Sequence, residues 1–148
     1  MNLDDVLQNV TRLFLDTAPI IYYVEQNPQF FTSAELIFDR IEKGQVTAVT
    51  SPITLAECLI FPYRASDINL AKAFTNRIVH GVNILFMPVD EVVADKAARF
   101  RAQYNLALAD ALQIAAAIAA SCDVFVTNDL QLKRVTDLQV LVLSEIDM

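Results

Sequence analysis

Glycine, histidine and cysteine are all scarce in this sequence: among 148 residues there are two glycines, one histidine and two cysteines. Phosphate-binding loops of nucleotide-binding proteins need several glycines, so the shortage excludes their common motifs. His80 cannot build a zinc site alone, and Cys58 and Cys122 have neither zinc spacing nor redox-pair spacing. Any site chemistry must therefore come from other residue types.

Long hydrophobic runs are also missing. The longest unbroken apolar stretch, residues 114–120, is far shorter than the roughly 18 residues that a membrane-spanning helix needs. The first residues, Met1 to Asp5, are acidic and lack the basic-then-apolar order of a secretory signal. We therefore expect one cytoplasmic domain over residues 1–148, with both cysteines as reduced thiols.

Positive charge is outweighed by negative charge. Eleven Lys and Arg face 18 Asp and Glu, which gives a net charge of −7 and a pI near 4.5. Such a chain lacks the overall basic surface of a nucleic-acid coat protein. A polyanionic partner would have to be held by a local patch or through bound cations. Disorder is excluded, because 55% of the residues are apolar.

Short apolar runs alternate along the chain with longer segments of helical periodicity. Strands are expected at residues 12–16, 46–50, 82–87, 123–127 and 139–143. Helices are expected at residues 18–26, 29–43, 51–61, 67–80, 90–103, 108–121 and 130–135. Pro62 is expected to end its helix, and Gly44 to take the left-handed conformation after another.

This alternation predicts an α/β protein. The expected strands are mostly continuous apolar runs, which is typical of strands covered on both faces, and helical crossovers between them make the strands parallel. A three-layer α/β/α sandwich with a parallel sheet of about five strands follows. Because sites in such sheets form beyond the carboxyl ends of the strands, residues just after a strand are the candidates for function.

Four acidic residues occur in apolar surroundings at this expected edge: Asp16, Glu57, Asp110 and Asp129. Ionised carboxylates are seldom buried without a partner, because desolvation is costly. If the four converge, mutual repulsion raises their pKa values unless a cation is present. Oxygen ligands without His or Cys favour Mg²⁺ or Mn²⁺. Other acids, such as Glu35 and Asp95, have basic neighbours and are interpreted as solvated charge.

Each acid also has a plainer interpretation. Asp16 and Asp110 are placed where a carboxylate can cap a helix, and Asp129 can belong to an ordinary turn after a strand. Glu57 lies within an expected helix, where there is neither a cap nor a turn to form. The evidence for a functional site is therefore the common placement of the four acids at the expected sheet edge. Their spacing along the chain does not by itself indicate a site.

The order of these motifs resembles that of the PIN-domain nucleases, and most closely the VapC-type ribonuclease toxins of bacterial toxin–antitoxin pairs. The resemblance extends from about Arg12 to Leu143, and the residues before Arg12 have no assigned role. It rests on these motifs: Leu15-Asp16-Thr17, Thr54 to Glu57, Asp110-Ala111-Leu112 with its Ala-rich helix, and Val126-Thr127-Asn128-Asp129.

The resemblance implies that Asp16, Glu57, Asp110 and Asp129 are the catalytic and metal-binding acids. It further implies that the hydroxyls of Thr17 and Thr127 orient carboxylates or water, and that Asn128 lies beside the pocket without being a ligand. One or two Mg²⁺ or Mn²⁺ ions would then support hydrolysis of RNA phosphodiester bonds. The implied partners are an RNA substrate, an antitoxin held in a groove between residues 18–43 and 51–80, and a second copy in a homodimer.

Two sets of residues could contact RNA but have a more ordinary explanation. Basic residues that could hold phosphates, but are better explained as salt-bridged or solvated, are Arg64, Arg99, Arg101, Lys133 and Arg134. Aromatic residues that could stack on bases, but are better explained as core, are Tyr22, Tyr23, Phe61 and Tyr63.

Other functional classes fit less well. A haloacid-dehalogenase-type phosphatase needs a second acid two residues after Asp16, where this chain has Ala18. A receiver domain needs a lysine after the fifth strand, and none follows Leu143. Flap-type DNA nucleases usually carry insertions too long for this chain. The serious alternative is a PIN-like domain with weak or no catalysis that acts by binding a protein, and failure to bind metal would favour it.

Overall fold

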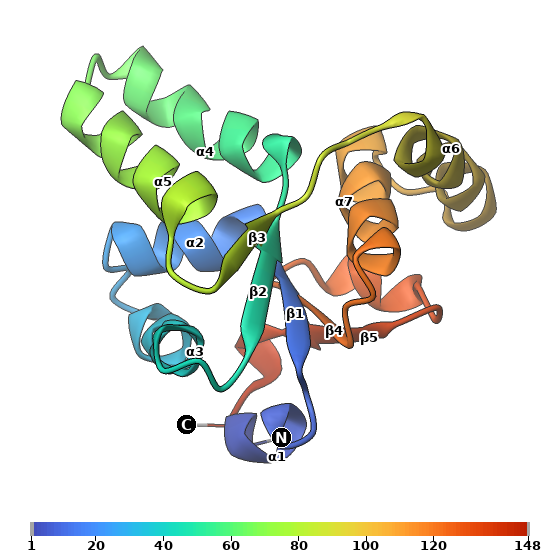
Figure 1. Ribbon diagram of the computed structural model, residues 1–148, viewed down its shortest axis with the longest axis horizontal. Helices are drawn as coiled ribbons and strands as arrows, with labels where there is room; N and C mark the ends of the chain where they lie inside the picture. The colour runs from blue at the N-terminus through green and yellow to red at the C-terminus, as the bar shows by residue number, and fades with distance from the viewer. Residues whose placement is uncertain (1, 148) are drawn as a thin grey trace.

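The computed structural model describes residues 2–147, so Met1 and Met148, the ends of the expected domain, lie outside the described residues. Figure 1 shows how the elements are arranged around a central sheet. The elements are, in order, α1 (Leu3–Leu7), β1 (Arg12–Leu15), α2 (Thr17–Val24), α3 (Phe31–Glu42), β2 (Thr47–Thr50), α4 (Pro52–Arg64), α5 (Ile68–His80), β3 (Ile84–Phe86), α6 (Glu91–Tyr104), α7 (Leu108–Ala119), β4 (Val124–Thr127), the 3-10 helix η1 (Leu130–Arg134), β5 (Gln139–Val142) and the 3-10 helix η2 (Leu143–Glu145).

The five strands form one parallel sheet in the order β3-β2-β1-β4-β5. The central strands are buried on both faces: Leu13 and Leu15 belong to one apolar cluster, while Phe14 belongs to the other. Phe14 of β1 stacks on Phe125 of β4 with ring centroids 5.1 Å apart. The predicted parallel α/β sandwich is therefore confirmed. The strands read as continuous apolar runs because helices cover both of their faces, as predicted.

Helices cover the two faces unequally. Figure 1 shows α2, α3, α4 and α5 on one side of the sheet and α6 and α7 on the other. The first cluster takes Phe38 from α3 and Phe74 from α5, whereas the second takes Phe100 from α6 and Ile114 from α7. The helices of each layer thus bury their apolar sides against one face of the sheet. The carboxyl ends of the strands lie between the two helical layers.

The residues before Arg12, to which no role was assigned above, fold into α1 and join the core. Leu3 and Leu7, one helical turn apart, are buried in the first cluster, and the Asn2 side chain caps the helix by accepting from the Asp4 N–H. An isolated bridge pairs Asn2 with Asp147, so the two ends of the described chain lie side by side. This segment therefore belongs to the folded unit.

Three expectations about element limits are wrong. α4 continues through Pro62 to Arg64, because the proline lies in the last turn and the carbonyls of Phe61 and Pro62 are bonded by later N–H groups. α3 begins at Phe31, because the Asn27 side chain accepts the two preceding N–H groups and holds a turn there. β3 is shorter than expected, since Asn83 has a positive φ of 59°.

Other expected features occur as predicted. Gly44 is left-handed, with φ +75°, and the Asp67 side chain caps α5 by accepting from Leu70 N–H. Cys58 and Cys122 are free thiols, and burial raises the pKa of each to about 12. Over residues 2–147, none of the helices has both the length and the apolar character needed to cross a membrane.

Candidate functional site

The strand order places a crevice between the carboxyl ends of β1 and β4. From β1 the chain builds outward through β2 to β3 and then crosses back to β4 on the other side of β1. Ligands of open parallel sheets bind at such a reversal. A pocket of about 280 Å³ opens there, lined by Asp16, Thr17, Ala18, Ile21, Tyr22, Glu57, Asp110, Thr127, Asn128 and Asp129. The structure thus brings together all seven site residues singled out in the sequence.

Asp16 and Asp129 are linked through the hydroxyl of Thr127. Asp16 follows β1 and is only 8% exposed. Thr127, the last residue of β4, donates its hydroxyl proton to Asp16 Oδ2 over 2.8 Å and accepts the N–H of Asp129 over 3.1 Å. Asp129 Oδ1 in turn accepts the N–H of Gln131 over 2.9 Å. Asp129 therefore does form the turn that its plainer interpretation proposed, while its carboxylate also faces the pocket.

Glu57 comes to the same pocket from α4. Thr17, the first residue of α2, donates its hydroxyl proton to Glu57 Oε1 over 2.8 Å. Glu57 lies within α4, as predicted, and is exposed, unlike Asp16. Its apolar sequence neighbours face other directions on the helix, as Cys58 does in the core. The contact nevertheless fixes the carboxylate beside the end of β1.

Asp110 enters from the opposite helical layer. It lies in the first turn of α7 and is half-buried. The N-cap of α7 is Ala107, and the helix has no side-chain cap hydrogen bond. Asp110 is therefore not a helix cap. Asp16 does occupy the N-cap position of α2, but its side chain makes no capping bond there.

Negative charge in the pocket is uncompensated. Burial, together with the neighbouring carboxylates of Asp16, Asp129 and Glu57, raises the pKa of Asp110 to about 6. Burial also raises the pKa of Asp16, against the opposing effect of its hydrogen bonds with Thr127 and Thr17. No Lys or Arg lines the pocket, and none of the four acids joins an ion pair between described residues. Such a pocket attracts a cation.

A buried polar network beneath the carboxylates joins α4 to α7. Gln113 accepts the Ser51 hydroxyl proton at Oε1 and donates from Nε2 to Thr54 Oγ1 over 2.6 Å. Thr54 in turn donates to the Leu15 carbonyl over 3.4 Å, and Ser51 caps α4. All three network side chains are at most 1% exposed. Gln113 lies one turn after Asp110, so the network sets the spacing between the two helices that carry Asp110 and Glu57.

Sequence reasoning missed this network. A glutamine within the apolar run of α7 was a usable signal, because a buried polar side chain needs partners. The partners could not be identified in advance, since Ser51 and Gln113 are 62 positions apart in the chain.

Asn128 lies beside the carboxylates and joins β4 to neighbouring segments. Its Oδ1 accepts the N–H of Ser144 over 2.9 Å. Its Nδ2 donates to the hydroxyl oxygen of Tyr22 over 3.0 Å. The residue therefore lies beside the pocket, and its side chain holds Tyr22 at the pocket wall.

The basic residues lie outside the pocket lining. Arg99 pairs with Asp95 and Lys133 with Glu145, while Arg101 and Arg134 donate to backbone carbonyls. Arg99 and Lys133 are therefore salt-bridged, as interpreted from the sequence. Arg64, Arg101 and Arg134 are exposed, as expected of solvated charge, and join no ion pair between described residues. Acidic residues outside the pocket are paired in the same way: Asp39 forms a salt bridge with Lys43, and Glu42 forms one with Arg77.

The aromatic residues divide into two pairs. Tyr22 and Tyr23 pack against the first cluster, as expected of core residues. Phe61 and Tyr63 are 61% and 59% exposed, so assigning them to the core was wrong. Both lie in the last turn of α4, which extends beyond the sheet and offers them little to pack against.

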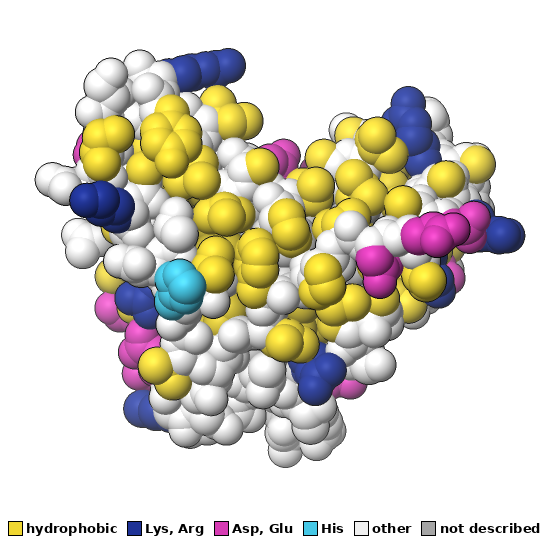
Figure 2. Space-filling view, turned by 45° about the horizontal axis from the view of Figure 1, so that its top comes forward, with side chains coloured by type: hydrophobic (Ala, Val, Ile, Leu, Met, Phe, Trp, Pro, Cys, Tyr) yellow, Lys and Arg dark blue, Asp and Glu magenta, His cyan; other side chains and the backbone are white. Residues whose placement is uncertain are grey.

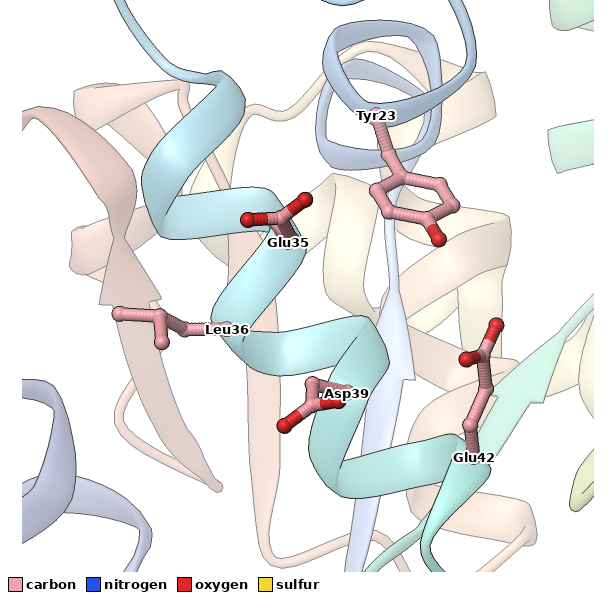
Figure 3. Close-up of a pocket in the computed structure, with 5 residues that line it drawn as sticks. All are labelled: Tyr23, Glu35, Leu36, Asp39 and Glu42. Carbon is pink, nitrogen blue, oxygen red and sulfur yellow. The ribbon is translucent and has the colours of Figure 1, made fainter.

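A second hollow runs along α3, away from the carboxylate pocket. Figure 3 shows Tyr23 of α2 facing this helix, with Glu35, Asp39 and Glu42 spaced along it. A neighbouring hollow shares Tyr23 and Glu35 and continues to Arg77 of α5. A groove between residues 18–43 and 51–80 therefore exists, lined by Glu35 on one side and Arg77 on the other, while Asp39 and Glu42 line only the hollow along α3.

The carboxylate pocket has oxygen ligands of the kind that a hard cation prefers, but these oxygens are not gathered around one point in the described residues. Carboxylate oxygens are the ligands that Mg²⁺ and Mn²⁺ prefer, and the pKa of Asp110 is raised by burial and by the neighbouring carboxylates. Across residues 2–147, no three Asp, Glu, His or Cys side chains are gathered as a finished metal site. The carboxylates therefore fit a metal by chemistry and would have to turn toward one another to hold it.

Comparison with known proteins places the chain in a family. The family model described as "PIN domain" matches residues 13–138. The chain therefore belongs to the PIN-domain family, and the resemblance found in the sequence is confirmed. No curated protein sequence matches it.

Solved structures share the fold. VapBC2 from Rickettsia felis, bound to a DNA fragment from its promoter, is 18% identical with a TM-score of 0.68, over 89% of this chain and 98% of that one. FitAcB from Neisseria gonorrhoeae is 23% identical with a TM-score of 0.67, over 90% and 99%. Mycobacterium tuberculosis VapC20, a toxin that cleaves the Sarcin-Ricin loop, is 14% identical with a TM-score of 0.63, over 76% and 86%.

Proposed function

We propose that the chain is a metal-dependent endoribonuclease and the toxin of a type II toxin–antitoxin pair that acts in the cytoplasm. The observation that carries the proposal is the convergence of four unpaired carboxylates on one pocket at the strand reversal. Membership of the PIN-domain family supports it, and so does the fold shared with VapC20, a toxin that cleaves the Sarcin-Ricin loop.

In this proposal Asp16, Glu57, Asp110 and Asp129 hold one or two Mg²⁺ or Mn²⁺ ions. A bound ion of this kind activates water and neutralises charge on a phosphodiester. Thr127 keeps the Asp16 carboxylate turned toward the pocket, and Thr17 does the same for Glu57. The half-buried Asp110 completes the donor set from the opposite layer.

Cleavage of a pool of single-stranded RNA tests this proposal. With Mn²⁺ the wild-type chain should cut the pool, and EDTA should stop it. Asp16→Asn keeps the size of the side chain but removes a charge, so it should lower the rate at least a hundredfold. Wild-type protein that cuts no RNA at any Mn²⁺ concentration would favour the alternative of a protein-binding module without catalysis.

An antitoxin segment is the proposed occupant of the groove between α2, α3 and α5. A solved structure that shares the fold, 15% identical with a TM-score of 0.67, is described as a toxin-antitoxin complex from Klebsiella pneumoniae. In this chain the exposed Glu35 lines both hollows beside Tyr23, while Asp39 and Glu42 are already paired with Lys43 and Arg77. A segment with a basic side chain would complement Glu35.

A homodimer is the proposed assembly. β3 is an edge strand, and Leu85 on it is 44% exposed while Val82 beside it is 67% exposed. Figure 2 shows hydrophobic side chains gathered in the hollow between the two helical sides of the molecule. An apolar surface next to an open sheet edge is a liability unless it is covered, and a second copy would cover it.

A further inference from the structure

The hydrogen bond between Asn128 and the Tyr22 hydroxyl can run in one direction only. Asn128 Oδ1 already accepts the N–H of Ser144, so the side-chain amide cannot be turned over without losing that bond. Its Nδ2 must therefore face Tyr22, and the phenol oxygen is the acceptor in that contact. The proton of Tyr22 consequently points to some other partner.

No such partner occurs within residues 2–147, where the contact with Asn128 is the only hydrogen bond of the Tyr22 hydroxyl. The other two hydroxyls of the pocket lining are both engaged, since Thr17 donates to Glu57 and Thr127 to Asp16. Tyr22 is thus the one lining hydroxyl in the described chain whose proton is free for a ligand.

Charge indicates which ligand group would take this proton. The pocket is lined by four carboxylates and by no Lys or Arg. An anionic substrate oxygen would find no cationic side chain there, so a neutral donor is the group left to bind it directly. The Tyr22 hydroxyl is held in place before any substrate binds, because the Tyr22 ring stacks on Phe30 with centroids 4.8 Å apart and Asn128 donates to its oxygen. A fixed donor loses little freedom on binding.

We propose that the Tyr22 hydroxyl donates a hydrogen bond to a phosphate oxygen of the RNA backbone beside the carboxylates. Asn128 is then a positioning residue, which acts on the substrate through Tyr22. This inference rests on the proposed ribonuclease function.

Tyr22→Phe tests the inference, because it removes the hydroxyl and keeps the ring against Phe30. With single-stranded RNA and Mn²⁺, kcat/KM should fall about tenfold to a hundredfold, as expected for one lost bond to a charged group. The rise of the unfolding temperature on adding Mn²⁺ should not change, since Tyr22 is not a proposed metal ligand. Tyr104→Phe is the matched control: it removes a hydroxyl that donates to Asp137 over 2.6 Å, outside the pocket, and should leave the rate unchanged.

Failure of the donor role can be told apart from failure of the nuclease function. If the wild-type chain cuts RNA and Tyr22→Phe cuts it equally well, the donor role is wrong and the nuclease function stands. Equal loss of cleavage and of the Mn²⁺ response would also overturn the donor role, because it would show general damage to the pocket. Wild-type protein that cuts no RNA would end both proposals together.

Discussion

Asp110 is a residue of the pocket at which burial and neighbouring negative charge both oppose ionisation. Its pKa is raised to about 6 by burial and by three neighbouring carboxylates. A folded-state pKa above the unfolded value means that the folded protein binds this proton more tightly. The stabilising contribution of that proton is present below about pH 4 and is lost as the pH rises through about 6. At neutral pH the ionised carboxylate therefore opposes folding unless a cation is bound.

Asp110→Asn should stabilise the metal-free protein at pH 7 and abolish cleavage. The gain should be about 1–2 kcal/mol, because partial exposure screens part of the effect of the pKa shift. It should shrink toward zero near pH 4, where the wild-type carboxyl is protonated. Thermal unfolding in EDTA between pH 4 and pH 7 measures the difference.

Asp5→Asn is the control for that prediction. Asp5 is an exposed acid in the first turn of α1, where negative charge is favourable. Its removal should leave stability unchanged or slightly lower at pH 7. A fully active, destabilised Asp110→Asn protein would mean that Asp110 has only a structural role in α7.

Asp123 shows the opposite behaviour outside the site. Its carboxylate accepts the N–H groups of Thr11 and Arg12 over 2.9 and 3.0 Å, together with the Thr11 hydroxyl proton. These bonds lower its pKa. A lowered folded-state pKa gives stability that is present above the unfolded value and is lost as the pH falls through the folded value.

Asp123→Ala should accordingly destabilise the protein by about 1–2 kcal/mol at pH 7. The difference from wild type should narrow below pH 4, as the wild-type carboxyl becomes protonated. Urea unfolding at both pH values measures it, and an unchanged midpoint at pH 7 would show that these bonds add nothing to stability. Cleavage should be unaffected, since Asp123 lies at the opposite, amino-terminal end of β4.

At the scale of the elements, the Gln113 network joins α4 to α7 beneath the carboxylates. Gln113→Leu should cost about 1–3 kcal/mol of stability, since the Ser51 and Thr54 hydroxyls would lose a buried partner. It should also weaken Mn²⁺ binding, because the helices that carry Glu57 and Asp110 would no longer be held at one spacing.

Thr50→Val provides the matched comparison. The Thr50 hydroxyl is buried and donates to the Ile78 carbonyl over 2.8 Å, away from the pocket. This variant should lose comparable stability and keep the wild-type Mn²⁺ affinity. Equal Mn²⁺ affinity in both variants would mean that the network stabilises the fold without positioning the acids.

The elements were mostly predictable, because helices and parallel strands leave strong periodic signals. The strand ends also predicted where Asp16 and Asp129 would lie. Contacts between distant segments were not predictable: Thr17 with Glu57 and Asn128 with Tyr22 depend on how α2 crosses the sheet edge. Pro62 was misread because a proline in a last turn does not remove the bonds that follow it. α1 was not predicted, because two leucines one helical turn apart are too few to show a periodic pattern.

On the scale of the whole molecule, the open sheet edge and the hydrophobic hollow predict self-association. Light scattering should give about twice the 16.5 kDa of one chain. Leu85→Lys places a charge on the edge strand and should shift the mass toward the monomer. Leu36→Lys alters a comparably exposed leucine on α3 and should leave the mass unchanged. A wild-type monomer at high concentration would contradict the proposed homodimer.

A Mn²⁺ titration of the wild-type chain and Asp110→Asn, followed by the unfolding temperature, shows whether the four carboxylates form a metal site. A ligand at about 100 times its dissociation constant adds roughly 2.7 kcal/mol, which such an experiment resolves easily. We expect a saturable rise of the unfolding temperature in the wild-type chain that is lost or strongly reduced in the variant. No rise in the wild-type chain, or an equal rise in both proteins, would contradict the proposed metal site.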